Sequence, residues 1–383
     1  MQSRAPRVCV VSATPLTMFF FFSEHLRELS KCADITVAYN KNYNSEVQPI
    51  NAPVLEKHLD IQRGISFFKD FKALISMIMF FKKNKFDMVI TLVPKSGLLG
   101  MLAARFCRIP VRLNIFQGEA WSVKVGATRV LLKLATTLTA ICSTNLLAVS
   151  NSQRNFLIRE GIAPAAKVVV LGSGSIAGVD LKRFQPNQES RKIIRGQYNI
   201  NDGAKLLLFV GRITRDKGVV HLVRTFAKIL IDEPDTFLII VGPDEEGITV
   251  ELQSLINREN QHKLIFTGFT ARPESFMAAA DILCLPSLRE GFGMVALEAA
   301  ACALPCVGSN IYGLRDAIAD KKSGLLVAVE DENALLDGLK TLIYDLNLCA
   351  RLGNYGRLRV LSDFDSQIVV GKYLTYFKER LNI

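Results

Sequence analysis

The sequence predicts an α/β protein with two doubly wound, Rossmann-like domains, each built on a parallel sheet. The chain has 383 residues, which is too long for one compact core and suits two domains. Hydrophobic residues make up 49% of it, so both halves can bury a core. Short, nearly continuous apolar runs alternate with helix-like segments almost throughout, which is typical of parallel strands covered by helices on both faces.

Each half contains six candidate strands. The pattern restarts after a polar, irregular stretch, Phe184–Ser190, so we place the domain boundary there and expect domains at 1–185 and 186–365. The candidate strands of the first half are 7–13, 34–39, 87–93, 111–116, 145–150 and 167–174. Those of the second half are 205–212, 236–242, 263–269, 281–287, 304–310 and 324–329.

The positive charge of the chain is unevenly distributed. The formal net charge is +11. Residues 1–185 hold 24 Lys and Arg against 11 Asp and Glu, whereas residues 186–383 hold 23 against 25. The first domain therefore carries the whole basic excess, which favours a surface for phosphates, anionic lipid or nucleic acid on that half alone.

Two apolar segments bear on the lipid option. Ile65–Phe86 mixes large apolar residues with lysines and ends in a basic cluster, as an interfacial helix attracted to anionic headgroups does. A core helix with solvated lysines explains the same composition, so both interpretations stand. Leu131–Val149 contains Lys133, several threonines and Asn145, and it reads better as a buried helix followed by a strand than as a membrane span.

Cysteine and histidine give no sign of a metal or nucleophile site. The eight cysteines include no CxxC pair and no signal peptide is recognisable, so we expect buried thiols in a reducing compartment. His25 falls inside a candidate helix and His221 lies four residues after Lys217, and neither is expected to be catalytic. Spacing supports no Ser-His-Asp or Cys-His arrangement.

Open parallel sheets bind ligands at the carboxyl ends of their strands, so we expect the active site in the cleft between the two domains. The first strand of the second domain ends at Gly211, where the backbone can turn without a Cβ. Arg212 and Lys217 follow around the start of the next helix, and two cations beside a helix amino terminus suit a diphosphate. A solvated basic turn is the alternative.

A second stretch at the same edge, Arg289–Ala300 (REGFGMVALEAA), places Glu290 before a helix and Glu298 on its second turn. A carboxylate at Glu298 could accept both hydrogen bonds of a vicinal diol. Glycines at the helix mouth permit close approach of an anion to the backbone amides of Gly291, Phe292, Gly293 and Met294. The combination suits a nucleoside diphosphate sugar, whereas a capping residue and a surface glutamate would not explain the glycines.

These motifs resemble those of the family-4 retaining glycosyltransferases, which have the GT-B fold. The resemblance rests on Gly211–Arg212 with Lys217 and on the two glutamates in EGFGMVALE. It also rests on VGSN and GLLV downstream and on GSGSIAGVDLKRF before the boundary. It is specific over 167–330 and weaker in the first domain. The fold it implies has two domains facing each other across a cleft, with residues 366–383 as a helix returning to the first domain.

The resemblance implies a role for each motif. Arg212, Lys217 and Glu290 would be catalytic, the two cations holding the donor diphosphate and Glu290 contacting the donor sugar. Glu298 would bind the ribose. The other implied donor-binding residues are Gly211, Phe269, Thr270, Gly291, Phe292, Gly293 and Met294, with Phe269 and Thr270 beside the base. No metal or other cofactor is expected, because cations and helix amides would stabilise the leaving diphosphate in a front-face displacement.

The first domain departs from the family pattern. It lacks a paired-glycine loop after the first strand and has VVSATPLTMFFFF there. Where a histidine is common, it has QGEAW, so Gln117, Gly118, Glu119 and Trp121 lie on the expected acceptor side without an assignable catalytic role. Glu119 is a candidate contact to acceptor or donor sugar. Trp121 is either a core residue or a platform on which a sugar stacks.

We therefore expect a hexosyl- or N-acetylhexosaminyl-transferase with a nucleotide-sugar donor, UDP-linked by preference. The acceptor suggested is a polyprenyl-diphosphate-linked saccharide of surface polysaccharide, such as O-antigen, at the inner face of the cytoplasmic membrane. A soluble or other lipid acceptor is the same-fold alternative, and a non-catalytic nucleotide-sugar-binding protein is another. A nicotinamide dehydrogenase would need GxGxxG after its first strand, and recognisable nucleic-acid-binding modules are missing.

Overall fold

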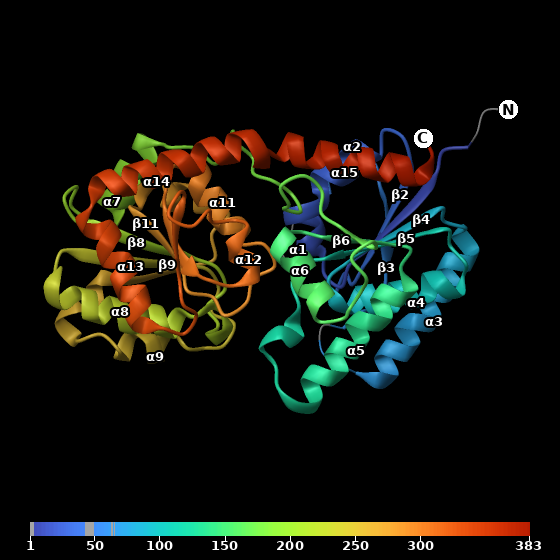
Figure 1. Ribbon diagram of the computed structural model, residues 1–383, viewed down its shortest axis with the longest axis horizontal. Coiled ribbons are helices and arrows are strands. Elements are labelled where there is room, and N and C mark those ends of the chain that lie inside the picture. Colours follow the sequence, from blue (N-terminus) through green and yellow to red (C-terminus); the bar gives the residue numbers. More distant parts are fainter. Residues whose placement is uncertain (1–3, 43–49, 63, 65) are drawn as a thin grey trace. The chain divides into compact units, whose positions relative to one another are not determined.

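The computed structural model describes residues 4–42, 50–62, 64 and 66–383, and the chain forms two compact units. The first unit comprises Met1–Ala177 and Gln367–Ile383, and the second Gly178–Ser366. Each unit is built on a parallel sheet flanked by helices (Figure 1). The expected fold class, two Rossmann-like sheets of the GT-B type, is confirmed.

The sheet of the first unit has seven strands in the order β3-β2-β1-β4-β5-β6-β7. Residues 8–11 of the central β1 are fully buried, as parallel strands covered on both faces require. The strands are β1 (Arg7–Val11), β2 (Asp34–Tyr39), β3 (Leu55–His58), β4 (Met88–Leu92), β5 (Val111–Phe116), β6 (Asn145–Ala148) and β7 (Val168–Val169). The candidate strands are thus confirmed, and β3 is an edge strand that the apolar pattern did not predict.

Helices cover both faces of this sheet. Figure 1 shows α3 (Phe67–Asn84), α4 (Pro94–Phe106) and α5 (Gly126–Cys142) side by side, with α4 packed against both neighbours. The opposite side carries α2 (Ser23–Leu29) and α15 (Ser366–Leu381). The remaining short elements are α1 (Pro15–Thr17), the π-helix Met18–Phe22, the 3-10 turn Ala120–Val123 and α6 (Asn151–Arg159). Ile65, the first residue of the expected interfacial helix, lies outside the described residues.

The sheet of the second unit has six strands in the order β10-β9-β8-β11-β12-β13. Its core is aliphatic, with Leu207, Leu238 and Leu339 among the fully buried residues. The strands are β8 (Lys205–Val210), β9 (Thr236–Val241), β10 (Leu264–Gly268), β11 (Ile282–Leu285), β12 (Cys306–Ser309) and β13 (Gly324–Val327). All six were predicted from the apolar runs.

Helices alternate with these strands along the chain, as in a doubly wound sheet, and further helices precede β8 and follow β13. The longer ones are α7 (Gln188–Gln197), α8 (Val219–Asp232), α11 (Met294–Ala301), α13 (Glu332–Tyr344) and α14 (Leu346–Arg359). The shorter ones are α9 (Thr249–Ser254), α10 (Pro273–Ala279), α12 (Tyr312–Arg315), the 3-10 turns Arg215–Lys217 and Arg258–Lys263, and the π-helix Val360–Phe364.

The boundary between the units falls after Ala177 and not after residue 185. Backbone hydrogen bonds explain the shift: the amide of Val179 donates to the carbonyl of Phe364, and the amide of Ser366 donates to the carbonyl of Val179. Segment 178–185 therefore belongs to the second unit. The sequence predicted the boundary at the polar stretch Phe184–Ser190 instead, because hydrogen bonds between backbone groups cannot be recognised from amino-acid composition.

The C-terminal helix belongs to the first unit, as its resemblance implied. The hydroxyl of Tyr373 donates to the carbonyl of Ser175 at 3.1 Å, and the Tyr376 hydroxyl accepts from Asn145 at 3.3 Å. The rings of Tyr373 and Phe377 are fully buried. Among the helices of the described segments, none is both long enough and apolar enough to cross a bilayer.

Candidate functional site

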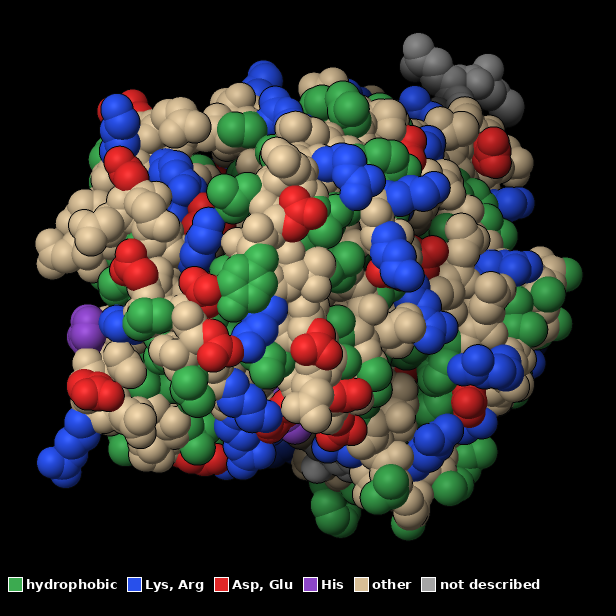
Figure 2. Space-filling view, turned by 60° about the vertical axis from the view of Figure 1, so that its left-hand side comes forward, with side chains coloured by type: hydrophobic (Ala, Val, Ile, Leu, Met, Phe, Trp, Pro, Cys, Tyr) green, Lys and Arg blue, Asp and Glu red, His purple; other side chains and the backbone are tan. Residues whose placement is uncertain are grey.

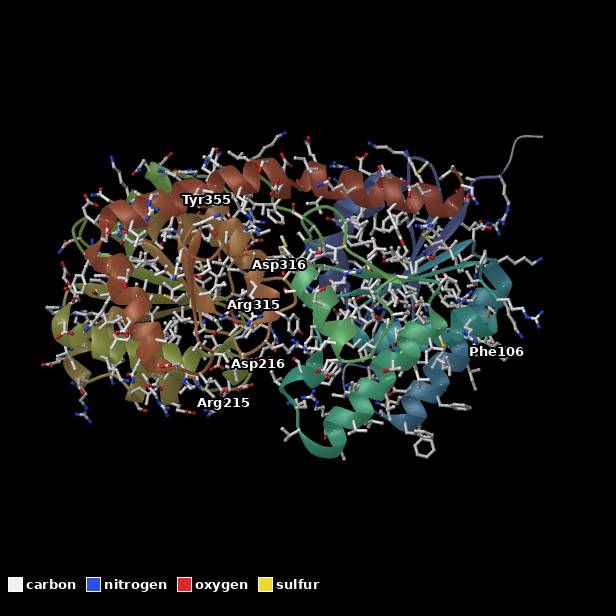
Figure 3. All side chains as sticks on the ribbon, viewed as in Figure 1. Phe106, Arg215, Asp216, Arg315, Asp316 and Tyr355 are labelled. Atoms are coloured by element: carbon white, nitrogen blue, oxygen red, sulfur yellow. The ribbon has the colours of Figure 1, made fainter. Side chains whose placement is uncertain are left out.

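The candidate site of the second unit lies at the carboxyl end of its sheet. Strands β8 and β11 are hydrogen-bonded neighbours, with Leu207 paired to Ile282, so the loops that follow them meet at one edge. Those loops are residues 211–218 and 286–293, which contain the predicted diphosphate and sugar ligands. Figure 3 shows Arg215 and Asp216 at the same edge of the unit as Arg315, which follows β12.

The two loops are bonded directly to each other. The amide of Leu288 donates to the carbonyl of Asp216 at 2.9 Å, and the Arg289 guanidinium pairs with the Asp216 carboxylate at 3.1 Å. Burial acts to raise the pKa of Asp216, but the Thr214 hydroxyl and the nearby cations outweigh burial and hold that pKa below its usual range. Asp216 is therefore an ionised anchor that fixes one loop on the other.

Gly218 brings the two loops into contact. Its φ of 71° lies in the left-handed region, and a Cβ at this position would overlap the carbonyl oxygen of Pro286. Both features require glycine. Since Gly218 is also the N-cap of α8, the close approach sets where Lys217 lies relative to the second loop.

Lys217 and Glu290 form an ion pair across the loops. The Lys217 ammonium lies 2.6 Å from Glu290 Oε1, and the Ser287 hydroxyl donates to the same oxygen at 3.1 Å. Both side chains are largely buried, with 17% and 16% of their surfaces exposed. The structure thus brings the predicted phosphate ligand and the predicted sugar ligand together, which their separation of 73 residues did not guarantee.

Arg212 is held by the acidic loop that follows β9. Its guanidinium donates to Glu245 Oε2 at 2.7 Å, and its side chain is 44% exposed. Asp244 caps the start of α9, and its carboxylate accepts hydrogen bonds from Ile248 and Thr249. The Thr249 hydroxyl bond is the largest cause that lowers the pKa of Asp244 to about 2.

The mouth of α11 has the geometry of an anion site. The helix begins at Met294, and its N-cap Gly293 has a φ of 70°, which carries the chain sharply into the helix. The helix dipole and first-turn amides favour negative charge here. The Phe292 ring is buried against Phe364, with 5.8 Å between the ring centroids. A ligand can therefore contact the backbone of Phe292 but not its ring.

Glu298 lies one turn into α11, and no Lys, Arg or His of the described residues forms a direct ion pair with its carboxylate. Burial raises the pKa of its carboxyl to about 7; Arg183 opposes this rise and Glu274 adds to it. Arg183 and Glu274 are themselves joined at 2.8 Å. Glu298 therefore changes charge near neutral pH.

The two predicted base-side residues lie after edge strand β10. Phe269 exposes 68% of its surface, so its ring is open to stacking, and Thr270 accepts a hydrogen bond from the amide of Arg272. The loop is tied to its neighbour, because the amide of Gly242 donates to the carbonyl of Gly268. Gly211 is tied in the same way, by its amide to the carbonyl of Val241.

In the first unit the predicted acceptor-side residues divide into two groups. Gln117, Gly118 and Glu119 line a small pocket after β5, together with Asn114 and Thr136. Trp121 is 1% exposed, and its indole donates to Glu119 and Thr136, both at 3.1 Å. Trp121 is thus a core residue, and the alternative of a stacking platform for a sugar is wrong.

Several contacts of the site were not predicted from the sequence. They are the Asp216–Arg289 pair, Ser287 beside Glu290, Glu245 on Arg212, and the Arg183–Glu274 pair near Glu298. Of these residues, Glu245 lies in a segment that stands out in the sequence, the acidic loop 242–247 (GPDEEG) after a strand. Asp216, Ser287 and Glu274 belong to no recognisable sequence motif. Among the described residues no cluster of three His, Cys, Asp or Glu side chains is arranged to hold a metal ion.

Comparison with known proteins agrees with this geometry. Residues 190–359 match the family model for glycosyl transferases group 1. The chain is 28% identical to the capsular polysaccharide biosynthesis glycosyltransferase CapM of Staphylococcus aureus over 88% of each chain. It is also 28% identical to the UDP-Gal:α-D-GlcNAc-diphosphoundecaprenol α-1,3-galactosyltransferase of Escherichia coli, over 76% of this chain and 75% of that one.

Solved structures share the fold at low identity. HepE of Anabaena in complex with UDP and glucose aligns with a TM-score of 0.81 at 16% identity, over 98% of this chain and 100% of that one. Sucrose-phosphate synthase of Thermosynechococcus elongatus aligns with a TM-score of 0.80 at 20% identity, over 98% of each. The expected enzyme class, a hexosyl- or N-acetylhexosaminyl-transferase, is confirmed: the chain has the GT-B fold, its residues 190–359 match the glycosyl transferases group 1 model, and both relatives above are glycosyltransferases.

Proposed function

We propose that the chain is a retaining glycosyltransferase that moves a sugar from a UDP-sugar to a polyprenyl-diphosphate-linked saccharide in the synthesis of a surface polysaccharide such as O-antigen. The observation that supports the donor most directly is the Lys217–Glu290 pair beside the mouth of α11. A cation and a carboxylate at one helix terminus are the groups that a phosphate and the hydroxyls of a sugar would need. UDP in a structural relative supports the same ligand class.

In the proposed complex, Arg212 and Lys217 bind the diphosphate and the amides of 291–294 stabilise the charge that grows on it. Arg212 must exchange Glu245 for phosphate, and Lys217 must share its charge between Glu290 and the ligand. Glu290 then accepts hydrogen bonds from the sugar, Glu298 accepts from the ribose and Phe269 stacks on the base. Stabilising the departing diphosphate is the main catalytic contribution of these groups.

Retention follows from this proposal if the acceptor approaches on the face that the diphosphate leaves. The C–O bond to the diphosphate breaks as the bond to the acceptor oxygen forms, and a phosphate oxygen takes the acceptor proton. No protein base is required, which agrees with the ion-paired state of Glu290. The segment Gln117–Glu119 after β5 is the proposed acceptor side.

The lipid-linked acceptor is supported by two relatives. The Escherichia coli relative acts on a diphosphoundecaprenol-linked sugar, and the Staphylococcus aureus relative is assigned to capsular polysaccharide. Such an acceptor lies in a membrane, so we place the enzyme at the inner face of the cytoplasmic membrane. A water-soluble acceptor is the second candidate, because the N-acetyl-α-D-glucosaminyl L-malate synthase of Bacillus anthracis is 29% identical over 65% of this chain.

The test is a screen of radiolabelled nucleotide sugars with the full chain and a membrane extract of the source cell. Label that moves into an organic-extractable product supports the lipid-linked acceptor, whereas label in a water-soluble product supports the second candidate. Proton NMR of the product gives the anomeric configuration, and an inverted product would contradict retention.

Variants then test the assigned roles. Glu290→Ala is expected to lower kcat by about a hundredfold, since it removes contacts that tighten in the transition state. Glu251→Ala is the matched control, because Glu251 is also paired with a cation, Arg215, and has no assigned role. Full transfer activity of Glu290→Ala would remove Glu290 from the mechanism.

A further inference from the structure

Helix α5 exposes an aliphatic stripe. Leu131, Leu134, Leu138 and Ile141 recur at intervals of three, four and three residues, which places them on one face of the helix. Each is between 46% and 56% exposed, and Val130 beside them is 58% exposed. The face buried against the unit carries smaller side chains, Thr136, Thr139, Ala140 and Cys142. The helix is thus turned with its large aliphatic residues outward.

Helix α3 exposes aromatic rings and lysines. Phe67, Phe68 and Phe71 are 81%, 86% and 59% exposed, and Met79 is 62% exposed. The side chains that anchor this helix to the core are Ala73, Met77 and Phe81, spaced four residues apart. Four exposed lysines share the outer surface with the rings: Lys69, Lys72, Lys82 and Lys83. Large exposed patches of this kind mark interaction sites.

The two exposed faces belong to one helical layer. Helix α4 packs against both α3 and α5, and the Arg105 guanidinium at its end donates to the carbonyl of Ile141. Phe106 follows, 62% exposed, with Lys82 of α3 at 5.0 Å from its ring centroid. Figure 3 shows Phe106 on the outer side of this layer. The stripe of α5 and the rings of α3 can therefore meet one partner.

The positive charge of the layer formed by α3, α4 and α5 indicates which kind of partner it can bind. Residues 67–142 contain 12 Lys and Arg but 3 Asp and Glu. All three acids are engaged: Asp70 with Lys95, Asp87 with Arg4, and Glu119 with Trp121. In Figure 2, green hydrophobic and blue basic side chains mix along the lower right of the view. A second copy of this chain would oppose this surface with the same positive charge, whereas an anionic bilayer matches both its charge and its apolar groups.

We propose that the outer faces of α3 and α5 form a two-helix docking surface for an anionic lipid bilayer. The aliphatic stripe of α5 and the rings of α3 enter the interface, and the lysines of α3 bind the headgroups. Contact through two neighbouring helices fixes the orientation of the first unit relative to the bilayer, whereas a unit held by one interfacial helix could rotate about that helix. The inference deepens the proposed function, on which it rests because a polyprenyl-linked acceptor lies in the membrane.

The test is co-sedimentation of the full chain with vesicles of phosphatidylcholine alone or mixed equally with phosphatidylglycerol. The wild type is expected to bind the mixed vesicles more tightly. The stripe variant Leu131→Gln/Leu134→Gln/Leu138→Gln should weaken binding by about tenfold or more by removing inserted apolar area. The lysine variant, with Lys69, Lys72, Lys82 and Lys83 changed to Gln, should lose about fivefold per lysine on anionic vesicles.

The matched control is Ile231→Gln/Val250→Gln, which removes two aliphatic side chains of the second unit that are 80% and 77% exposed. It should bind vesicles as the wild type does. Unchanged binding of the stripe variant would overturn the role of α5, and a wild-type dimer in light scattering that the stripe variant abolishes would assign the surface to a second copy.

Donor turnover measured without vesicles separates this inference from the proposed function. The stripe variant should release UDP from a UDP-sugar at the wild-type rate, because its changes lie in the first unit on an outer face. Normal turnover without vesicle binding in the wild type would refute the docking surface alone. Vesicle binding without turnover of any nucleotide sugar would refute the proposed function alone.

Discussion

At the scale of single residues, Glu298 is a member of the proposed donor site whose charge changes near neutral pH. Its carboxyl has a pKa raised by burial to about 7, so it is largely neutral at pH 6 and ionised at pH 8. A neutral carboxyl cannot accept both hydrogen bonds of the ribose diol as a carboxylate does. Donor binding should therefore depend on pH across this range.

We predict that the KM for the nucleotide sugar falls by about tenfold from pH 6 to pH 8, following ionisation of Glu298. Glu298→Gln should raise KM at pH 8 and make the profile flat between these limits. The measurement is initial-rate kinetics at fixed acceptor. A Gln variant that keeps the wild-type slope would assign the titration to another group.

The same raised pKa has a consequence for stability. The folded protein holds a proton on Glu298 between the ordinary glutamate value, 4.5, and about 7, whereas the unfolded chain releases it. Folding stability contributed by this group is therefore present at low pH and is lost as pH rises through that window. We predict that Glu298→Gln gains thermal stability relative to wild type at pH 8 but not at pH 5, as followed by circular dichroism.

Arg212 gives a second residue-scale prediction. Arg212 pairs with Glu245, and in the proposed complex the donor diphosphate would displace that carboxylate. Both groups are well exposed, so the pair is weak. Glu245→Gln is expected to lower the donor KM by up to about fivefold, which corresponds to the upper range for surface pairs. The control is Glu251→Gln, which removes the partner of Arg215 in the same way and should leave the donor KM unchanged. If Glu245→Gln instead raises the donor KM, Glu245 orients Arg212 for the donor.

The sequence predicted residue identities at the site better than their contacts. Lys217 and Glu290 could be named as candidates because each follows a strand end beside a glycine, and their roles were implied by the family resemblance. Their pairing, and the Asp216–Arg289 bond beside it, depend on which strands are neighbours in the sheet. For Trp121 the sequence identified the residue but not its role. A single tryptophan is compatible with a core position or with a stacking platform for a sugar, and only its burial decides between them.

At the scale of elements, the two loops after β8 and β11 act as one structural unit. They share the Leu288–Asp216 backbone bond, the Arg289–Asp216 pair and the close approach of Gly218 to Pro286. A change that separates them should disturb Lys217 and Glu290 together. If Lys217 and Glu290 have the proposed roles, Gly218 should affect catalysis although it has no side chain.

We predict that Gly218→Ala lowers the free energy of unfolding by about 1–3 kcal/mol, because its φ of 71° and the Pro286 carbonyl both oppose a Cβ. It should also lower kcat. The measurement is urea denaturation together with initial rates. Gly196→Ala is the matched control: Gly196 lies in α7 with open space around its Cβ position, so alanine should be neutral or slightly stabilising.

Elements were predictable where an apolar run fixed them. All strands that are buried on both faces were found, since no other pattern explains short runs of valine, leucine and isoleucine between helices. Strand β3, Leu55–His58, was missed because all four residues are exposed and it exists by pairing with β2. The exposed stripe of α5 was also missed, because leucines at helical spacing predict a buried face.

At the scale of the whole molecule, the charge is divided between the two halves. The second half carries 23 Lys and Arg against 25 Asp and Glu, although it contains the proposed diphosphate site. Anion binding there must come from local groups rather than from net charge: Arg212, Lys217 and the amino terminus of α11. In the proposed complex these groups would supply the stabilisation that a metal ion gives to leaving diphosphates in other enzymes.

We therefore predict that transfer does not require a divalent metal. The rate after dialysis against EDTA should equal the untreated rate, and added Mg²⁺ or Mn²⁺ should not raise it. Lys217→Ala should lower kcat by about a hundredfold under both conditions, because the cation it removes is the protein's own. A wild-type enzyme that EDTA inactivates and Mn²⁺ restores would contradict the prediction, and it would show that Arg212 and Lys217 alone do not balance the charge of the leaving diphosphate.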